Sequence, residues 1–198
     1  MTSASHTSSQ SATPGTLSRP RIWAWPVAAL LGFPIGGWIA NVVVGPVDSV
    51  GAALAGGLLA GAVVGSAQWL ALKQVVPWTW IAATSLGMAF GLAVGAAVVD
   101  YGIDRGDLML MGAVTGLGVG GLQALVLARR GLSGAAWWAV VNPPAWALAW
   151  LVSSYVISGN VKERFTNFGA SGTLLYALLT GLVLAWLIRE TESRARAT

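Results

Sequence analysis

Amides and one hydroxyl are the clearest polar side chains within the long apolar stretches of this chain. Gln68, Gln123 and Thr180 occupy equivalent positions in three similar segments. Because amides and hydroxyls donate and accept hydrogen bonds, these residues could line a polar vestibule for a neutral molecule. They could instead join neighbouring helices, at under about 2 kcal/mol for each contact. We favour the second interpretation, since no charged residue accompanies them and functional sites inside membranes usually contain one.

Asn41 and Asn142 are two further candidates for such a vestibule, each within an apolar run. Asn142 precedes Pro143 and Pro144, and proline removes a backbone donor and can break a helix. A broken helix would expose carbonyl groups able to coordinate a ligand or an ion. Membrane helices also tolerate prolines as simple kinks, which is the interpretation we favour.

The segment from Asp100 to Asp107 is the most charged loop between apolar runs. Its three carboxylates could hold a hard cation such as Ca²⁺, which takes six to eight oxygen ligands. The spacing does not fit the EF-hand pattern, and Arg105 can neutralise its acidic neighbours. We therefore expect no metal ion, no cofactor and no catalytic residue.

The overall composition excludes an ordinary soluble domain. The 198 residues are 56% hydrophobic and only 9% charged, with 26 glycines and no cysteine, whereas a soluble domain is about 25% charged. The net charge is +4, and most basic residues stand at the ends of apolar runs. A soluble enzyme is not expected, and neither is a nucleic-acid partner. The lipid bilayer is the expected environment.

The apolar runs are long enough to be membrane spans, since crossing the hydrocarbon takes roughly 20 residues of helix. Six runs reach this length: Trp23–Gly45, Val50–Leu72, Trp78–Val99, Leu108–Ala128, Ala135–Ile157 and Gly169–Ile188. The sequence therefore predicts an all-α integral membrane protein with six transmembrane helices. We expect a disordered Ser/Thr-rich tail over 1–20, a membrane domain over 21–189 and a charged tail over 190–198.

Basic residues predict the orientation, because they concentrate on the cytoplasmic side. Placing both termini in the cytoplasm puts eight basic residues there and three on the other side. Tryptophan, which favours the headgroup level, predicts a belt at the same end: Trp23, Trp25, Trp69, Trp78, Trp80, Trp137, Trp138 and Trp186.

Small residues recur every fourth position and reveal an internal repeat. Segments equivalent in spacing lie 55 residues apart, and a fainter third copy follows. The repeat predicts three hairpins in the same orientation, over 21–73, 76–129 and 134–189, related by a pseudo-threefold axis along the membrane normal. Helices in lipid associate by close packing of small residues. The predicted packing positions are Gly32, Gly36, Gly57, Gly61, Gly65, Gly87, Gly91, Gly95, Gly112, Gly116 and Gly120.

The run Gly61-x3-Gly65-x2-Gln68-Trp69-Leu70 resembles a motif of uncharacterised multi-pass bacterial membrane proteins, which carry it in tandem copies. The segment around Gln123 keeps this pattern with Ala124 in place of tryptophan, and the third segment has Thr180 in place of glutamine. The resemblance implies a tandem-hairpin architecture and a location in the bacterial plasma membrane.

Three functions are compatible with these features. The first is a non-enzymatic scaffold or accessory subunit, which would associate with other membrane subunits or with itself. The second is a small-molecule channel or uncoupled transporter, with a pore on the pseudo-threefold axis. The third is an intramembrane enzyme acting on a lipid or isoprenoid, which would depend on the boundary residues Asp48, Asp100 and Glu163. We favour the first.

Overall fold

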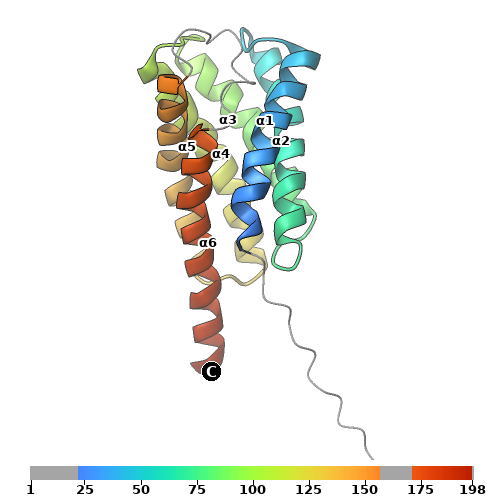
Figure 1. Cartoon of the computed structure of the whole chain (residues 1–198), viewed down its shortest axis with the longest axis vertical. Coiled ribbons are helices and arrows are strands. Elements are labelled where there is room, and N and C mark those ends of the chain that lie inside the picture. The colour runs from blue at the N-terminus through green and yellow to red at the C-terminus, as the bar shows by residue number, and fades with distance from the viewer. Residues whose placement is uncertain (1–21, 157–170, 198) are drawn as a thin grey trace, which may run out of the picture.

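A computed structural model of the chain describes residues 22–156 and 171–197. These residues form six helices and no strand (Figure 1): α1 (Ala24–Val44), α2 (Val50–Leu72), α3 (Thr79–Val98), α4 (Arg105–Arg129), α5 (Ala136–Val156) and α6 (Ser171–Ala197). Five of these helices, all except α5, are long and apolar enough to cross a membrane. The prediction of an all-helical, multi-pass membrane protein is confirmed to this extent. The predicted tail over 1–20 lies outside the described residues.

Helix α5 falls short of the hydropathy expected of a membrane span, although it is long enough and carries no charge. Four tryptophans and the Asn142-Pro143-Pro144 segment lower its mean hydropathy. The prediction of six spans counted these tryptophans as apolar, whereas an indole carries a polar N–H. Helix α5 packs against α4 and α6 along the bundle (Figure 1).

The helices form a ring in which each packs against its neighbours in the chain. The ring is closed by α1 and α6, which also contact each other, although more sparsely than any of the consecutive pairs. Helix α1 begins and α6 ends at the same end of the bundle, where α6 projects beyond the other helices (Figure 1).

Prolines do not interrupt the helices that contain them. Helix α1 continues through Pro34, and α5 continues through Pro143 and Pro144. The hypothesis that Asn41 and the Asn142-Pro143-Pro144 segment break their helices is therefore wrong. Contacts with neighbouring helices and side-chain hydrogen bonds hold such segments in helical form. One of these bonds joins Asn142 Nδ2 to the carbonyl of Trp138 at 2.8 Å.

Short turns connect α1 to α2 and α3 to α4, and they contain local capping groups. Gly45 ends α1 with a φ of +89°, a conformation that glycine adopts without steric cost. The Ser49 hydroxyl caps α2 by accepting from the Ala52 N–H at 3.2 Å. At the start of α4, the Asp107 carboxylate accepts from the Asp104 N–H at 3.3 Å. At these two turns the chain therefore reverses direction within a few residues.

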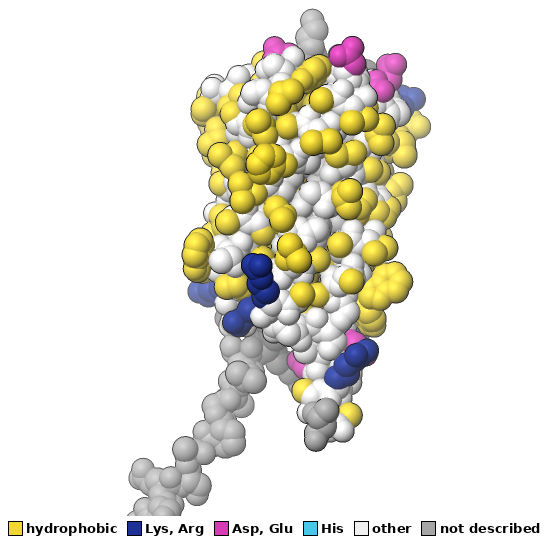
Figure 2. Space-filling view, turned by 180° about the vertical axis from the view of Figure 1, so that it is seen from behind, with side chains coloured by type: hydrophobic (Ala, Val, Ile, Leu, Met, Phe, Trp, Pro, Cys, Tyr) yellow, Lys and Arg dark blue, Asp and Glu magenta, His cyan; other side chains and the backbone are white. Residues whose placement is uncertain are grey.

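The surface of the bundle is divided into three zones. Figure 2 shows hydrophobic side chains over the length of the bundle, acidic side chains mainly at one end and basic ones mainly towards the other. The large exposed side chains include Leu31, Val43, Phe90, Leu117 and Leu182. A surface of this kind suits hydrocarbon along its middle and polar surroundings at both ends.

Candidate functional site

Three tryptophans meet inside the bundle and fill its interior near the end where α1 begins. Trp25, Trp80 and Trp138 come from α1, α3 and α5, and all three are fully buried. Their ring centroids are 5.8 to 6.4 Å apart, and two of the three pairs meet edge to face. Aromatic pairs prefer this geometry to direct stacking. We call these three residues the tryptophan layer.

Each indole of the tryptophan layer donates a hydrogen bond to the even-numbered helix before it in the ring. Trp80 Nε1 donates to Gln68 Oε1 at 3.0 Å, and Trp138 Nε1 donates to Gln123 Oε1 at 2.9 Å. Trp25 Nε1 donates to Thr180 Oγ1 at 3.0 Å, which joins α1 to α6. The first and last helices are thus linked by the same kind of bond as their neighbours.

The two glutamines are also bonded to each other. Gln123 Nε2 donates to Thr84 Oγ1 at 2.8 Å and to Gln68 Oε1 at 3.3 Å. The Thr84 hydroxyl donates its own proton to the Trp80 carbonyl at 2.9 Å, which leaves its oxygen free to accept. The hydroxyl of Thr180 does the same by donating to the Tyr176 carbonyl. Each of these donors and acceptors therefore has at least one partner inside the bundle.

A second polar contact lies further along the interior. Tyr176 Oη donates to Asn142 Oδ1 at 3.1 Å, and both residues are buried. Tyr176 also contacts Phe33 and Trp146, with the three ring centroids 5.3 to 5.5 Å apart. We call Phe33, Trp146 and Tyr176 the second aromatic layer.

Glycines allow the helices to approach closely enough for these side chains to meet. A Cβ atom built on Gly61 of α2 would lie 2.6 Å from Ser85 Cα of α3, and one on Gly87 of α3 would lie 2.6 Å from Val119 Cα of α4. All eleven glycines predicted at helix contacts have atoms of the next helix within 3.3 Å of such a Cβ. A side chain at most of these positions would push the backbones apart.

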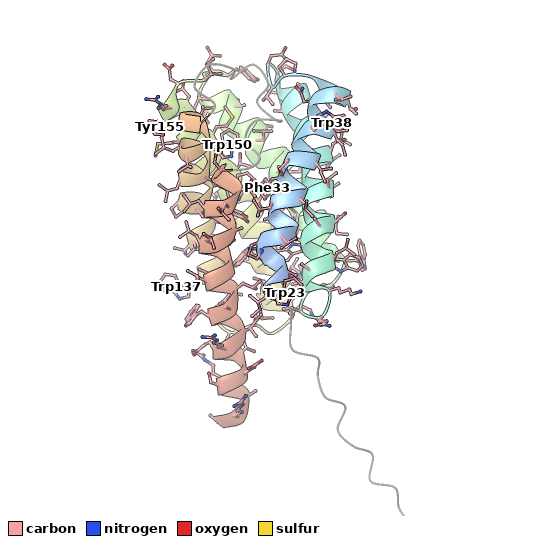
Figure 3. The ribbon with its side chains drawn as sticks, viewed as in Figure 1. Trp23, Phe33, Trp38, Trp137, Trp150 and Tyr155 are labelled. Atoms are coloured by element: carbon pink, nitrogen blue, oxygen red, sulfur yellow. The ribbon has the colours of Figure 1, made fainter. Side chains whose placement is uncertain are left out.

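Beyond the second aromatic layer the bundle contains a cavity of about 60 Å³. We call it the axial cavity, because all six helices contribute to its walls. It is lined mainly by carbon atoms, and the lining residues are Phe33, Gly37, Val47, Ala60, Val64, Met88, Leu92, Met111, Thr115, Trp146, Ala149, Trp150, Thr173 and Tyr176. Figure 3 labels two of these lining residues, Phe33 of α1 and Trp150 of α5.

The predicted vestibule residues are brought together only in part. Gln68, Gln123, Thr180 and Asn142 are all buried within the hydrogen-bonded interior, and none of them lines the axial cavity. Asn41 lies apart, near the end of α1, where its carbonyl accepts from the Gly45 N–H. The four buried residues therefore connect helices and do not face an open chamber.

The acidic residues considered for catalysis or metal binding lie in turns. Asp48 and Asp100 are exposed, in the α1–α2 and α3–α4 turns. Asp107 caps α4, while Arg105 lies over the Tyr155 ring, 4.2 Å from its centroid. Among the described residues, no group of three acidic or histidine side chains is placed to hold a metal ion. Glu163 lies outside the described residues.

Sequence reasoning placed Trp25, Trp80 and Trp138 in a surface belt, and this prediction is wrong. They are fully buried, whereas their neighbours Trp23, Trp78 and Trp137 are more than half exposed; Trp137 points away from the bundle in Figure 3. A signal was present in the sequence. Trp25 and Trp80 precede Gly32 and Gly87 by seven residues, two turns, which places each on the packing face.

Thr84 and Tyr176 were also missed as members of the polar network. Thr84 occupies the position equivalent to Ala29, and Tyr176 the position equivalent to Val64 and Val119. The other two copies of Tyr176 are apolar, so the repeat gave no indication of hydrogen bonding there. Asn142, four residues after Trp138, is the third equivalent of Thr84 and is polar, so the sequence did contain a signal for Thr84. Comparison with known proteins adds nothing to this description, since no family model, curated protein or solved structure matches the chain.

Proposed function

We propose that this chain is a non-enzymatic integral membrane protein, which acts as a scaffold or accessory subunit of a larger membrane assembly. The observation that carries this proposal is the tryptophan layer and its hydrogen bonds. Three indoles occupy the interior, and Gln68, Gln123 and Thr180 accept their N–H groups. These polar side chains are engaged in holding helices together, at up to about 2 kcal/mol for each contact.

The proposal includes three copies of one helical hairpin, with α5 as a sixth membrane span. Its support comes from equivalent residues in equivalent contacts. The three tryptophans occupy matching repeat positions, and each donates to a matching position on an even-numbered helix. The glycine rows follow the same rule, with α1 facing α2, α2 facing α3, α3 facing α4, and α4 facing α5.

We place the protein in the bacterial plasma membrane with both termini in the cytoplasm. Support for the orientation comes from the charges of the described residues. Lys73, Arg129, Arg130 and Arg189 belong to the end where α1 begins, and Asp48 and the acidic α3–α4 turn belong to the other. Basic residues favour the cytoplasmic side. The bacterial location follows from the resemblance of the glycine–glutamine motif.

A pore on the bundle axis is the second candidate, and the axial cavity is the feature that favours it. Such a pore would have to pass the tryptophan layer, where three large rings lie in contact. Opening would require rings to move and several buried hydrogen bonds to break together. The closed interior therefore favours the scaffold over the channel.

The mass of the protein in its native membrane tests the proposal. The chain would carry a C-terminal tag, be expressed at its natural level, be extracted in mild detergent and be weighed by native mass spectrometry. We expect particles well above the 20.3 kDa of one chain, which contain a further subunit or a second copy. Membranes from an untagged strain are the control.

A lone 20.3 kDa particle without companions would contradict the scaffold. Liposomes loaded with a small neutral solute supply the second arm. Release of this solute at a rate proportional to the amount of wild-type protein would contradict the scaffold function and support the channel function. Trp138→Ala is the companion variant here, because it opens space in the tryptophan layer and should be the leakier of the two if the axis can conduct.

A further inference from the structure

Positive charge at the end of the bundle where α1 begins is not balanced by acidic side chains. Lys73, Arg129 and Arg130 are exposed there, and Figure 2 shows basic side chains mainly towards this end. Among the described residues, ion pairs occur only in the last turns of α6, where Glu190 and Glu192 are each joined to an arginine of the same helix. These are the two acidic residues described at this end, so the cations of the α2–α3 and α4–α5 turns remain uncompensated.

The Arg130 guanidinium is held against the neighbouring turn. Its Nε donates to the Val75 carbonyl of the α2–α3 turn at 3.4 Å. Its backbone N–H is fixed as well, because it donates to the Val126 and Leu127 carbonyls at the end of α4. A guanidinium has five N–H donors and can bind two phosphate oxygens side by side. With Nε engaged, the donors of the two terminal nitrogens, which bind no acceptor in the described part of the chain, are available to an anion.

Lys73 brings a second positive charge to the same turn. It directly follows α2 and stands two residues before Val75. The turn has a defined shape, because the N–H groups of Val75 and Val76 both donate to the Leu72 carbonyl. A lysine ammonium is a point charge on a long, flexible stem. Lys73 can therefore reach the anion that Arg130 binds.

Exposed apolar side chains adjoin this pair of cations. Leu70 precedes Lys73 by three residues, which places both on one face of α2, and it is 61% exposed. Trp78, the N-cap residue of α3, is 67% exposed, and indoles favour the headgroup level of a bilayer. A partner that covers the cations together with these side chains must carry negative charge next to hydrocarbon. This is the chemistry of an anionic phospholipid and not of a soluble anion.

We propose that Leu70, Lys73, Trp78 and Arg130, which we call the basic turn site, bind a phospholipid whose headgroup carries a net negative charge. Arg130 donates to two phosphate oxygens, Lys73 adds a second charge, and the acyl chains lie against Leu70 and Trp78. The inference goes beyond the scaffold function and does not rest on it, because a membrane protein of any activity can hold a lipid at its surface. It is also independent of the orientation, since both ends of a membrane-spanning bundle reach headgroups.

Native mass spectrometry of the purified full-length protein in mild detergent measures the binding. The probe is dioleoyl-phosphatidylglycerol, and dioleoyl-phosphatidylcholine is the matched lipid with the same acyl chains and no net charge. A basic residue near the headgroups favours an anionic lipid about fivefold. We therefore expect the first phosphatidylglycerol to bind at least about tenfold more tightly than phosphatidylcholine. Lys73→Gln and Arg130→Gln should each weaken phosphatidylglycerol binding about fivefold and leave phosphatidylcholine binding unchanged.

Two further variants remove the same charge elsewhere. Arg196→Gln does so at the same end, on the exposed last turn of α6, and Arg105→Gln does so at the opposite end. Neither should weaken phosphatidylglycerol binding measurably, because salt screens exposed charges that lie away from the site. Far-ultraviolet circular dichroism reports whether each variant is folded. Lys73→Gln and Arg130→Gln test the site separately, so the loss of one variant to misfolding leaves the other.

Several outcomes would overturn the proposal. Equal affinity for the two lipids would show that headgroup charge is not recognised, and an unchanged preference in both Lys73→Gln and Arg130→Gln would place the recognition elsewhere. A loss in Arg196→Gln as large as that in Arg130→Gln would show attraction to net charge without a site. Displacement of phosphatidylglycerol by an equal concentration of glycerol 3-phosphate or hexaglutamate would assign these cations to a soluble anion or to an acidic protein segment.

Discussion

At the level of Trp25, Trp80 and Trp138 the bundle is filled by three large rings, whereas eight residues further along the same helices it is partly empty. Those later positions hold Phe33, Met88 and Trp146, all of which line the axial cavity. Eight residues correspond to about 12 Å of helix. The same three helices therefore produce a packed layer and a hollow one within two turns.

The difference lies in how alike the three side chains are at each level. Identical indoles can contact one another in turn, and each finds an acceptor at a matching position on an even-numbered helix. Phenylalanine, methionine and tryptophan differ in volume and polarity. The second level accordingly leaves a void and, within the part of the chain that the structure describes, a buried indole N–H without a hydrogen-bond partner. Sequence divergence at equivalent positions thus appears as free space and an unsatisfied donor.

The largest expected effect is the loss of a ring from the packed level. Trp138→Ala should lower the free energy of unfolding by about 3–5 kcal/mol, because it leaves a cavity and the Gln123 acceptor without its donor. Trp137→Ala, one residue earlier and 55% exposed, should cost less than about 1 kcal/mol. Denaturation in mixed micelles, followed by far-ultraviolet circular dichroism, measures both. Equal losses would contradict the packed layer.

A smaller effect is expected from the amide that connects the packed level. Gln123→Leu keeps most of the side-chain volume but removes its bonds to Trp138, Thr84 and Gln68. We expect a loss of about 1–2 kcal/mol, in the range measured for hydrogen bonds between membrane helices. Gln74→Leu, in the exposed α2–α3 turn, is the control. If both variants have the same free energy of unfolding as the wild type, the network contributes nothing to stability.

The smallest effect is expected where the hollow level is filled. Ala60→Val should change the unfolding free energy by less than about 0.5 kcal/mol, since the cavity has space for the added carbons. Ala29→Val, at a fully buried position one turn from Trp25, should cost about 1–3 kcal/mol by overpacking. The same micelle titration compares them. Equal costs would mean that the two levels are packed alike.

The glycine spacing carried most of the predictable information. Because residues four apart share a helix face, the rows through Gly57 and Gly87 indicated which faces meet, and close contacts occur at those positions. The buried tryptophans escaped prediction, because an indole suits both a membrane interface and a protein interior. Only their register with the glycines separates Trp25 and Trp80 from Trp23 and Trp78.

The axial cavity could not be predicted from the sequence. It depends on how far Phe33 and Trp146 reach across the bundle and on the volume that Ala60 and Ala149 leave open. These are differences between packed volumes, which no local pattern encodes. Tyr176 was missed for a related reason, since it is the single polar member of its set of equivalents, whereas Thr84 has a polar equivalent in Asn142.

The length of α6 has a mechanical consequence. The helix continues without a break to Ala197 and projects past the other helices (Figure 1), and its last turns carry the Glu190–Arg194 and Glu192–Arg196 pairs. A continuous helix transmits rotation as a rod does. Any module fused to its end would turn by about 100° and move about 1.5 Å for each residue inserted between them. The orientation of a fused module relative to the bundle can therefore be set in steps of one residue.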